Sequence, residues 1–346
     1  MHIALLIFAL ILIAALVIFM MGVLISGPRY RGPVSDHFDG RKFVNPGGVK
    51  AKGGLEVFKW MIQRKQGLWR KELTAETRNH PPGHFKDGIR VTFVNHSTFL
   101  IQVDGVNVLT DPVWSNRVSP YNWIGPKRMR PPGIPLGHLP RIHLIVLTHN
   151  HYDHLDIATM RVLFGAHHPQ IIAPLGVKKL LDDHHVSGAV EIDWWEEVKP
   201  AGLNIQAVPA QHFSGRGLLD RDASIWCGYV IKTGAGTLYF AGDTGYNPTL
   251  FKEIGTKCGP FAVSFLPIGA YKPGWFMAPI HVSPEESVRI HLDIKSQKSI
   301  AMHFGTFPLA DDGRDDPVND LRTAMEKHQV SNDSFIVLKE GEAVTF

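Results

Sequence analysis

The sequence is poor in cysteine and in charge. Its 346 residues include two cysteines, Cys227 and Cys258, which stand far apart and outside any metal-ligand spacing. This scarcity excludes a disulfide scaffold and fits a reducing compartment. Charged residues make up 20% of the chain and the formal net charge is +4. These values give no case for a nucleic-acid binder, and they indicate at most a weak attraction to anionic lipid head groups.

Lysine, arginine, aspartate and glutamate are all missing from residues 1–28. From Ile3 to Ile25 every residue is apolar or glycine, and about 20 such residues span the hydrocarbon core as a helix. A cleaved signal peptide would carry a basic start, a shorter apolar stretch and a small-x-small cleavage site. We therefore predict a retained single-pass transmembrane anchor over residues 1–28. The cations that follow the anchor predict that the remaining chain, including any catalytic domain, faces the cytoplasm.

Residues 29–88 are predicted to form a linker and an amphipathic arm. The stretch up to residue 53 is rich in glycine, proline and charge and has no apolar period. Residues 55–73 follow helical spacing, and one face of the predicted helix would gather Phe58, Met61, Ile62, Leu68 and Trp69. Two alternatives stay open for this helix. Either it lies in the lipid interface beside the anchor, or it packs on the domain with its basic face in solvent.

From residue 89 onward, short β-rich runs alternate with helical patterns. The run LIVLT at 144–148 is continuously apolar, as expected for a strand buried on both faces. Further strands are predicted at IRVTFVN, FLIQV, NVLTD, IIAP, NIQAVPA, IWCGYVIKT, TLYFAGD, AVSFLP and SIAMHF. Helices are predicted near 157–166, 176–184, 248–257, 283–292 and 317–328. The alternation predicts one layered α/β domain over residues 89–346.

The run THNHYDHLD at residues 148–156 contains four potential metal ligands within six positions: His149, His151, Asp153 and His154. It begins where a buried strand ends, which is where α/β sheets place their chemistry. Imidazole nitrogen and carboxylate oxygen are ligands for Zn²⁺, and iron or manganese are alternatives. A purely structural role would leave several charged groups to be buried, at several kcal/mol each. The run therefore predicts a metal site.

Three more potential ligands close later apolar runs. His212 ends VPAQH, Asp243 ends TLYFAGD before a tight turn, and His303 ends SIAMH. Each alone can be read as a turn or capping residue, but together they complete two shells. We expect His149, His151 and His212 to form the first site. Asp153, His154 and His303 would form the second, and Asp243 would bridge the two.

This pattern resembles the metallo-β-lactamase fold superfamily. Longer stretches resemble the N-acylphosphatidylethanolamine-hydrolysing phospholipase D family over roughly residues 40–346: PKRMRPP, IDWWEE (192–197), AGDTGY (241–246), PIGAYKPGWFM (267–277) and HFGTF (303–307). The resemblance implies an αβ/βα four-layer sandwich, two Zn²⁺ ions and a homodimer. Two departures are Asn95, where the family more often has glycine, and the anchor at 3–25, which animal members lack. Asn95 precedes His96, which is not among the predicted ligands.

Two metals that share a water lower its pKa towards neutrality. We therefore expect a metal-bridging hydroxide, oriented by Asp243, to attack a phosphodiester and leave N-acylethanolamine and phosphatidic acid. His281, before the predicted cap at Ser283, is the candidate acid and a candidate substrate contact; a purely structural role for it in the loop is the alternative. Tyr152 is a candidate substrate contact or a packing residue. Two interpretations stay open for the basic residues Lys127, Arg128 and Arg130. Either they bind lipid phosphates, or they form a solvated loop.

Three functions stay open on this evidence. The first is a membrane-bound, zinc-dependent phospholipase D that acts on phospholipid. The second is another hydrolase on the same scaffold, acting on a lactone, a thioester, a phosphonate or a nucleotide. The third is a non-catalytic, membrane-tethered metal-binding module. The paired ligand set argues against the third, because structural zinc sites are normally closed and hold one metal.

Overall fold

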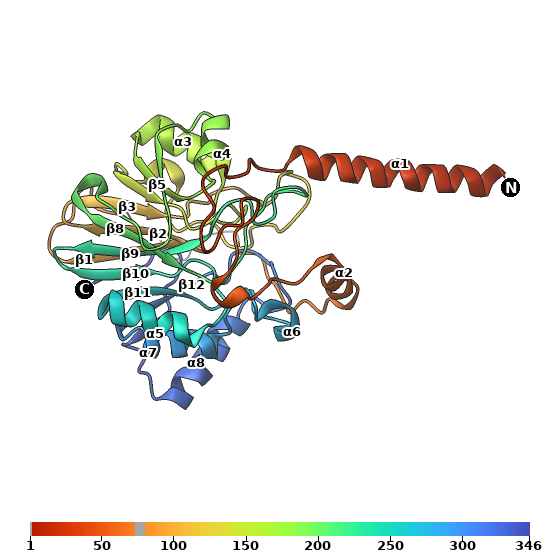
Figure 1. Ribbon diagram of the computed structural model, residues 1–346. Coiled ribbons are helices and arrows are strands. Elements are labelled where there is room, and N and C mark those ends of the chain that lie inside the picture. Colours follow the sequence, from red (N-terminus) through yellow and green to blue (C-terminus); the bar gives the residue numbers. More distant parts are fainter. Residues whose placement is uncertain (1, 73–79) are drawn as a thin grey trace.

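The structure, a computed structural model, describes residues 2–72 and 80–346 (Figure 1). Two seven-stranded sheets pack face to face, with helices on the outer face of each. The strand order is β14-β1-β2-β3-β4-β5-β6 in the first sheet and β13-β12-β11-β10-β9-β8-β7 in the second. The predicted four-layer αβ/βα sandwich is therefore confirmed, and one apolar helix, α1 (His2–Leu24), precedes it.

The first sheet joins an antiparallel half to a parallel half. Its strands are β1 (Ile89–Asn95), β2 (Thr98–Val103), β3 (Val106–Thr110), β4 (Leu144–Val146), β5 (Gln170–Pro174), β6 (Ala189–Ile192) and β14 (Ala343–Thr345). The outer face is covered by α3 (Ile157–His167) and α4 (Lys178–Asp183). Helix α3 begins where it does because the Asp156 carboxylate accepts the backbone N–H groups of Ala158 and Thr159.

The second sheet is built in the same way. It contains β7 (Glu197–Val198), β8 (Asn204–Pro209), β9 (Cys227–Thr233), β10 (Gly236–Phe240), β11 (Phe261–Pro267), β12 (Ser296–Met302) and β13 (Phe335–Ile336). Its outer face is covered by α5 (Pro248–Lys257), α7 (Pro284–Asp293) and α8 (Asp316–His328). The predicted capping box starts α7, since the backbone N–H of Ser283 donates to Glu286 and that of Glu286 donates to the Ser283 hydroxyl.

Aromatic side chains fill the space between the two sheets. Phe265 lies 4.8 Å from Phe99 of the opposite sheet and 5.8 Å from Phe240, measured between ring centroids. All three rings are fully buried. Burying a side chain of this size stabilises a fold by about 1.5–3 kcal/mol. This core holds the two sheets, and thus the loops at their edges, in a fixed relation.

Strand direction places six loops at one edge of the sandwich. In the first sheet, β1, β3 and β4 share one direction, because β1 and β3 are both antiparallel to β2 and β4 is parallel to β3. In the second sheet, β8, β10 and β12 share a direction for the same reason. The segments that follow these six strands carry His96, Asp111, His149–His154, His212, Asp243 and His303.

The predicted helix over residues 55–73 is wrong in its length. Helix α2 spans Gly54–Gln63. The end of the predicted helix, Leu73, lies outside the described residues, as does the rest of the segment 73–79 of the arm. The chain is no longer helical at Gly67, where a Cβ atom would come within 2.5 Å of the Gly313 backbone nitrogen. The Gly67 N–H donates to the Asp311 carbonyl instead of to a helical partner. Trp69 therefore lies outside the helix, and its indole N–H donates to the Asp312 carbonyl.

Candidate metal centre

All seven predicted ligands meet at this edge, and Asp243 lies at their centre. Its Oδ2 atom is 3.2 Å from His154 Nε2 and 3.1 Å from His303 Nε2. The same oxygen is 3.7 Å from His212 Nε2 and 4.0 Å from His149 Nε2. One carboxylate oxygen thus faces members of both predicted sites, which is the arrangement that a bridging ligand needs.

The three histidines of the predicted first site converge through their ring nitrogens. His151 Nδ1 lies 2.9 Å from His149 Nε2 and 3.2 Å from His212 Nε2. His149 and His212 are buried, and His151 is half-buried at the mouth of the group. These three nitrogens lie within 4.8 Å of one another, close enough to share one ion.

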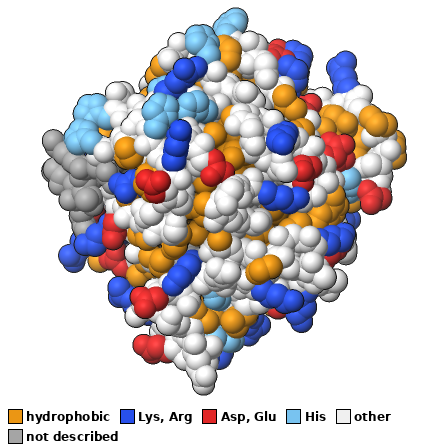
Figure 2. All heavy atoms as spheres, turned by 90° about the vertical axis from the view of Figure 1, so that its left-hand side faces the viewer, with side chains coloured by type: hydrophobic (Ala, Val, Ile, Leu, Met, Phe, Trp, Pro, Cys, Tyr) orange, Lys and Arg blue, Asp and Glu red, His pale blue; other side chains and the backbone are white. Residues whose placement is uncertain are grey.

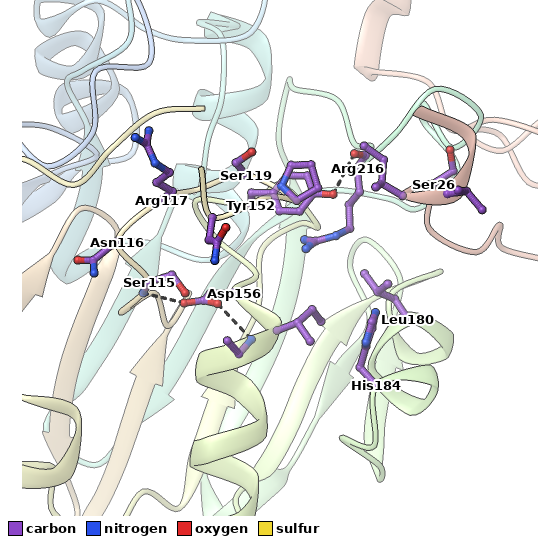
Figure 3. A pocket seen from close by; sticks show the side chains of 16 residues that line it. Ser26, Ser115, Asn116, Arg117, Ser119, Tyr152, Asp156, Leu180, His184 and Arg216 are labelled. Carbon is purple, nitrogen blue, oxygen red and sulfur yellow. Dashed lines mark hydrogen bonds between the residues drawn. The ribbon is translucent and has the colours of Figure 1, made fainter. Parts of the chain in front are cut away.

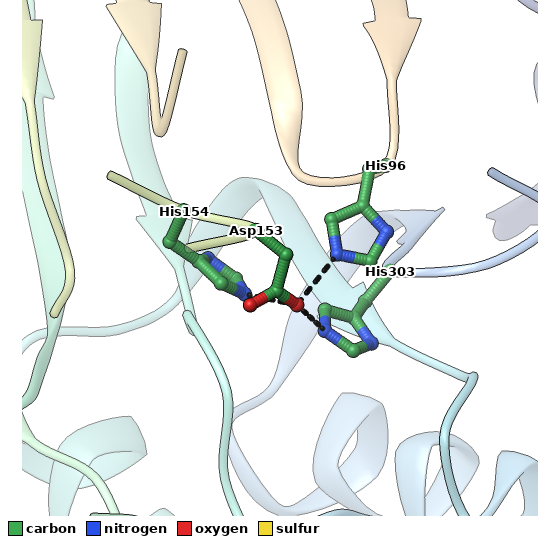
Figure 4. Close-up of side chains that lie close together, drawn as sticks. All are labelled: His96, Asp153, His154 and His303. Carbon is green, nitrogen blue, oxygen red and sulfur yellow. Dashed lines mark hydrogen bonds and ion pairs between the residues drawn. The ribbon is translucent and has the colours of Figure 1, made fainter. Parts of the chain in front are cut away.

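The predicted second site gathers around Asp153 and includes a residue that the sequence reasoning missed (Figure 4). Asp153 Oδ2 is 3.3 Å from His303 Nε2 and 3.6 Å from His154 Nε2. The additional residue is His96, whose Nε2 lies 3.1 Å from the same oxygen. His96 follows β1 in the same way that the predicted ligands follow their strands. The signal was therefore present in the sequence.

Partners outside the centre orient three of the histidines. His154 Nδ1 lies 2.7 Å from Asp111 Oδ2, and His212 Nδ1 lies 2.8 Å from the Ile280 carbonyl. His149 Nδ1 lies 3.0 Å from the Thr148 hydroxyl. In each ring the outer nitrogen is therefore engaged, and Nε2 is left to face the centre. Such partners fix the tautomer of a metal-binding histidine. Asp111 was also missed, although it closes the predicted strand NVLTD.

The carboxylates and imidazoles of the centre shift one another's pKa values. Burial opposes the ionisation of Asp243, but the positive charges of His154 and His303 outweigh it and hold its pKa well below the usual range. In turn, although burial lowers the pKa of His303, the Asp243 and Asp153 carboxylates together outweigh burial and raise it to about 9. Two buried carboxylates that draw protons onto neighbouring imidazoles are suited to a metal cation, which would take the place of those protons.

The donor atoms fit a transition metal. His154 Nε2, His303 Nε2 and Asp243 Oδ1 are buried and have no hydrogen-bond partner among the described residues. Leaving such groups unpaired costs about 1–3 kcal/mol each. Imidazole nitrogen and carboxylate oxygen are ligands for Zn²⁺ and also for iron and manganese. The residues present therefore fit one or two such ions.

Unusual backbone conformations place two of these residues. His96 and His303 have φ angles of 48° and 60°, in the left-handed region that non-glycine residues rarely adopt. The His303 N–H donates to the His96 carbonyl, so each turn supports the other. The Asp243 turn needs glycine at 242, since φ there is 63° and a Cβ atom would come within 2.9 Å of the Cys227 carbonyl. Strain of this kind is typical of functional sites.

His281 lies beside the centre, as predicted for the acid. Its Nδ1 is 3.8 Å from Asp243 Oδ2, and its side chain is 12% exposed. Its backbone N–H donates to Met277 at the end of the short helix α6 (Gly274–Met277), which fixes the loop before α7. Burial lowers the pKa of His281 to about 4, so that the imidazole is neutral at neutral pH.

Tyr152 and the predicted basic loop have structural partners. The Tyr152 hydroxyl donates to the Arg216 carbonyl at 3.1 Å, although its ring borders the cavity of the centre. Arg128 is buried and donates to Asn95 Oδ1 and to the Val113 carbonyl, both at 3.0 Å, so neither predicted alternative describes it. Asn95, the departure from the family pattern, thus holds the 126–132 loop. Arg130 pairs with Glu340, with 3.5 Å between the nearest atoms.

A cavity of about 340 Å³ opens over the centre. Its floor is polar and contains His151, Asp153, Asp243 and His281. Its walls contain the cations Lys52 and Arg221 and are otherwise largely apolar, with Val57, Trp60, Val118, Phe276, Met277, Ile280 and Leu309. Two of the wall residues, Val57 and Trp60, come from α2, and the Trp60 ring stacks on Phe276 at 5.1 Å. The arm before the sandwich thus forms part of the cavity wall.

Comparison with known proteins gives consistent matches. The sequence profile of the Beta-lactamase superfamily domain matches residues 106–304. An uncharacterised protein of Mycobacterium tuberculosis is 42% identical over 248 residues, which cover 70% of this chain and 66% of that protein, just under two thirds. N-acyl-phosphatidylethanolamine-hydrolyzing phospholipase D 1 of Caenorhabditis elegans is 36% identical over 272 residues, covering 75% of this chain and 76% of that protein.

The fold also matches solved structures. A metallo hydrolase from the archaeon Ignicoccus hospitalis superposes with a TM-score of 0.56 at 24% identity, covering 75% of this chain and 98% of that one. At this identity the match shows a shared fold and nothing finer.

Proposed function

This chain belongs to the metallo-β-lactamase superfamily and, within it, to the family of N-acyl-phosphatidylethanolamine-hydrolysing phospholipases D; from that premise we propose that it hydrolyses N-acylphosphatidylethanolamine-type phospholipids at a membrane surface. It is a metal-dependent hydrolase by fold and by ligand set. The proposal rests on the position of Asp243 Oδ2. This oxygen faces both histidine groups at the floor of a cavity whose walls are largely apolar.

We assign two metal ions to the centre, and Zn²⁺ is the ion we expect. His149, His151 and His212 would hold the first, Asp153, His154 and His303 the second, and Asp243 would contact both. His96 donates to Asp153, which places it as a partner of that carboxylate. When bound, two such ions supply Lewis acidity that activates water and neutralises phosphate charge.

The reaction that we assign breaks the bond between phosphorus and the oxygen of the N-acylethanolamine. Water supplies the new oxygen on phosphorus, which leaves phosphatidic acid, and the leaving oxygen takes up a proton. His281 is the group that we assign to deliver this proton. Burial lowers the pKa of His281 to about 4 in the chain without metal or substrate, and the negative charge of a bound phosphodiester favours the proton-donating form of a neighbouring imidazole.

The cavity walls suit a substrate with an apolar part. The polar floor takes a phosphate, and the rings and aliphatic chains above it, including Trp60, Phe276 and Leu309, take hydrocarbon. Tyr152 borders the same cavity, and we assign its ring, with His281, to contact the substrate.

The proposed membrane side is the side of α1. Residues Leu5–Leu24 are long and apolar enough to cross a bilayer. Helix α2 lies on the same side of the sandwich (Figure 1) and exposes Leu55, Phe58, Met61 and Ile62, by 62–84% of their surface. The face turned away from α1 carries acidic and basic side chains interspersed (Figure 2). We therefore propose that α1 anchors the chain and that α2 lies in the lipid interface beside the cavity.

Product profiling tests this function. Purified protein is mixed with vesicles of natural phospholipids doped with N-acylphosphatidylethanolamine, and the products are identified by mass spectrometry, with Asp243→Asn as the inactive control. We expect N-acylethanolamine and phosphatidic acid from the unaltered chain alone. Turnover of lactones or thioesters without any lipid product would assign the centre to another hydrolase of the superfamily. Equal products from both proteins would remove Asp243 from the mechanism.

A further inference from the structure

A single arginine holds both ends of the segment 150–155, which carries three of the proposed metal ligands. Arg216 Nη1 donates to the Asn150 carbonyl at 2.8 Å and to the Leu155 carbonyl at 2.9 Å. These two carbonyls flank His151, Asp153 and His154. One guanidinium nitrogen therefore bridges the two sides of this loop.

The residue between those carbonyls is held by the same arginine (Figure 3). The Arg216 guanidinium carbon lies 3.8 Å from the centroid of the Tyr152 ring, and the Tyr152 hydroxyl donates to the Arg216 carbonyl at 3.1 Å. The neighbouring Gly215 N–H donates to Asn150 Oδ1 at 2.8 Å. The loop from 150 to 155 is thus fixed at its start, its middle and its end by residues 215 and 216.

The Arg216 charge is largely buried, so its partners matter. Burial lowers its pKa, but an arginine stays protonated in proteins. A buried charge is costly unless it is hydrogen-bonded or paired. Here the two carbonyls and the Tyr152 ring compensate the guanidinium, and Asp220 Oδ2 accepts the Arg216 backbone N–H at 2.9 Å. Loss of this side chain would release the carbonyls and the ring together.

Residues 215–220, which hold the ligand segment, are also attached to the end of the apolar helix α1. Asp220 Oδ2 also accepts the Gly27 N–H at 2.9 Å. The Leu218 N–H donates to the Gly22 carbonyl at 2.8 Å, and the Leu219 N–H donates to the Ser26 hydroxyl at 2.9 Å. Figure 3 shows Ser26 beside the backbone of Arg216. Residues 215–220 therefore lie between the exit of α1 and the ligand segment, with hydrogen bonds to both.

We propose that residues 215–220 form a brace that fixes the ligand segment relative to the anchor, and that Arg216 is the positioning residue of the metal centre. The proposal rests on the metal assignment of the proposed function and is independent of which substrate is hydrolysed. Groups that orient metal ligands contribute about 10–100-fold to metal affinity. Lysine cannot replace Arg216 fully, since its ammonium is a point charge without the planar fork.

Cobalt titration of the metal-free full chain tests the brace. Co²⁺ binding is followed by its visible absorption, and the melting temperature of each metal-free protein is recorded beside it. We expect Arg216→Gln to bind Co²⁺ about 10–100-fold more weakly and with an altered spectrum, and Arg216→Lys to lie between it and the unaltered chain. Arg117→Gln is the matched control, because Arg117 lines the cavity of Figure 3 together with Arg216 and donates to the Gly125 carbonyl, with no hydrogen bond to residues 150–155 among the described residues. Its affinity should stay unchanged.

The outcomes separate the brace from the metal assignment. A lower melting temperature with unchanged Co²⁺ affinity in Arg216→Gln would overturn the positioning role and leave the metal centre in place. An unaltered chain that binds no Co²⁺ would overturn both. If Arg216→Gln does not fold, Arg216→Lys and Asp220→Asn decide the matter by the same titration. Asp220→Asn should also speed tryptic cleavage after Arg29 and Arg31, and an unchanged rate would remove the link to the anchor.

Discussion

Asp111 Oδ2 lies 2.7 Å from His154 Nδ1, and neither side chain is exposed to solvent. The same oxygen accepts the Thr148 hydroxyl at 2.7 Å. Because that proton is donated to Asp111, the Thr148 oxygen is left to accept from His149 Nδ1. One buried carboxylate therefore orients His154 directly and His149 through Thr148, so it acts on both proposed metal sites.

Replacing Asp111 should weaken both sites at once. We expect Asp111→Asn to lower metal affinity by about 10–100-fold, because the amide cannot accept in the same way from His154 and Thr148 together. Isothermal titration with Zn²⁺ measures the change. Asp104→Asn is the control, since Asp104 lies in a distant turn where its carboxylate accepts only the Gly234 N–H among the described hydrogen bonds. Equal affinities for the two variants would mean that Asp111 does not orient the ligands.

His281→Ala should separate substrates by their leaving groups. A general acid contributes about 10²–10⁴-fold when the leaving oxygen needs a proton. We therefore expect a loss of that size on N-acylphosphatidylethanolamine and a much smaller loss on a phosphodiester with an activated aryl leaving group. The two values of kcat/KM are compared for each protein. Similar losses on both substrates would reject the acid role and leave His281 a structural part of its loop.

His291 of α7 predicts a pH dependence of stability outside the centre. Its Nδ1 contacts the Ser299 hydroxyl at 2.9 Å, and burial lowers its pKa below the ordinary 6.5. The unfolded chain therefore binds more protons at this site, so the stability that His291 supplies is present above pH 6.5 and declines as pH falls below it. His291→Asn should be less stable at pH 7.5, and the deficit should narrow towards pH 5.

Thermal melts of both proteins across this range check the His291 prediction. Other histidines titrate in both proteins and cancel in the difference between them. A gap in melting temperature that stays constant with pH would contradict it.

A reporter fused after Phe346 checks the predicted topology. The first cations of the chain, Arg29 and Arg31, follow α1. By the tendency of such charges to stay inside, the catalytic domain should face the cytoplasm. A reporter that is active only in the cytoplasm should therefore be active. Activity of a reporter that works only on the outer side would reverse the assignment.

Much of the fold could be predicted from local patterns. The five helices predicted after residue 89 are present, and α5 spans the predicted residues 248–257, because proline and asparagine mark its start. The elements that were missed are short. Strands β6, β7, β13 and β14 have two to four residues, and α6 has four. Runs of this length show no measurable period and form only because a neighbouring strand or loop pairs with them.

The residues of the metal centre, like the elements of the fold, could be predicted only in part. The seven predicted ligands could be found because each follows an apolar run at a strand end. His96 and Asp111 carried the same signal, but their roles depend on partners distant in sequence, Asp153 for the first and His154 for the second. Arg216 carried no such signal. Its contacts with the Asn150 and Leu155 carbonyls form only when the chain folds, and no spacing of residues in the sequence indicates them.

The metal content of the purified chain tests the central claim most directly. Protein prepared without chelators is analysed by inductively coupled plasma mass spectrometry, with Asp243→Asn beside it. The shared contacts of Asp243 with both histidine groups predict close to two transition-metal ions per chain, and fewer in the variant. One ion per chain, or none, in the unaltered protein would contradict the two-metal centre.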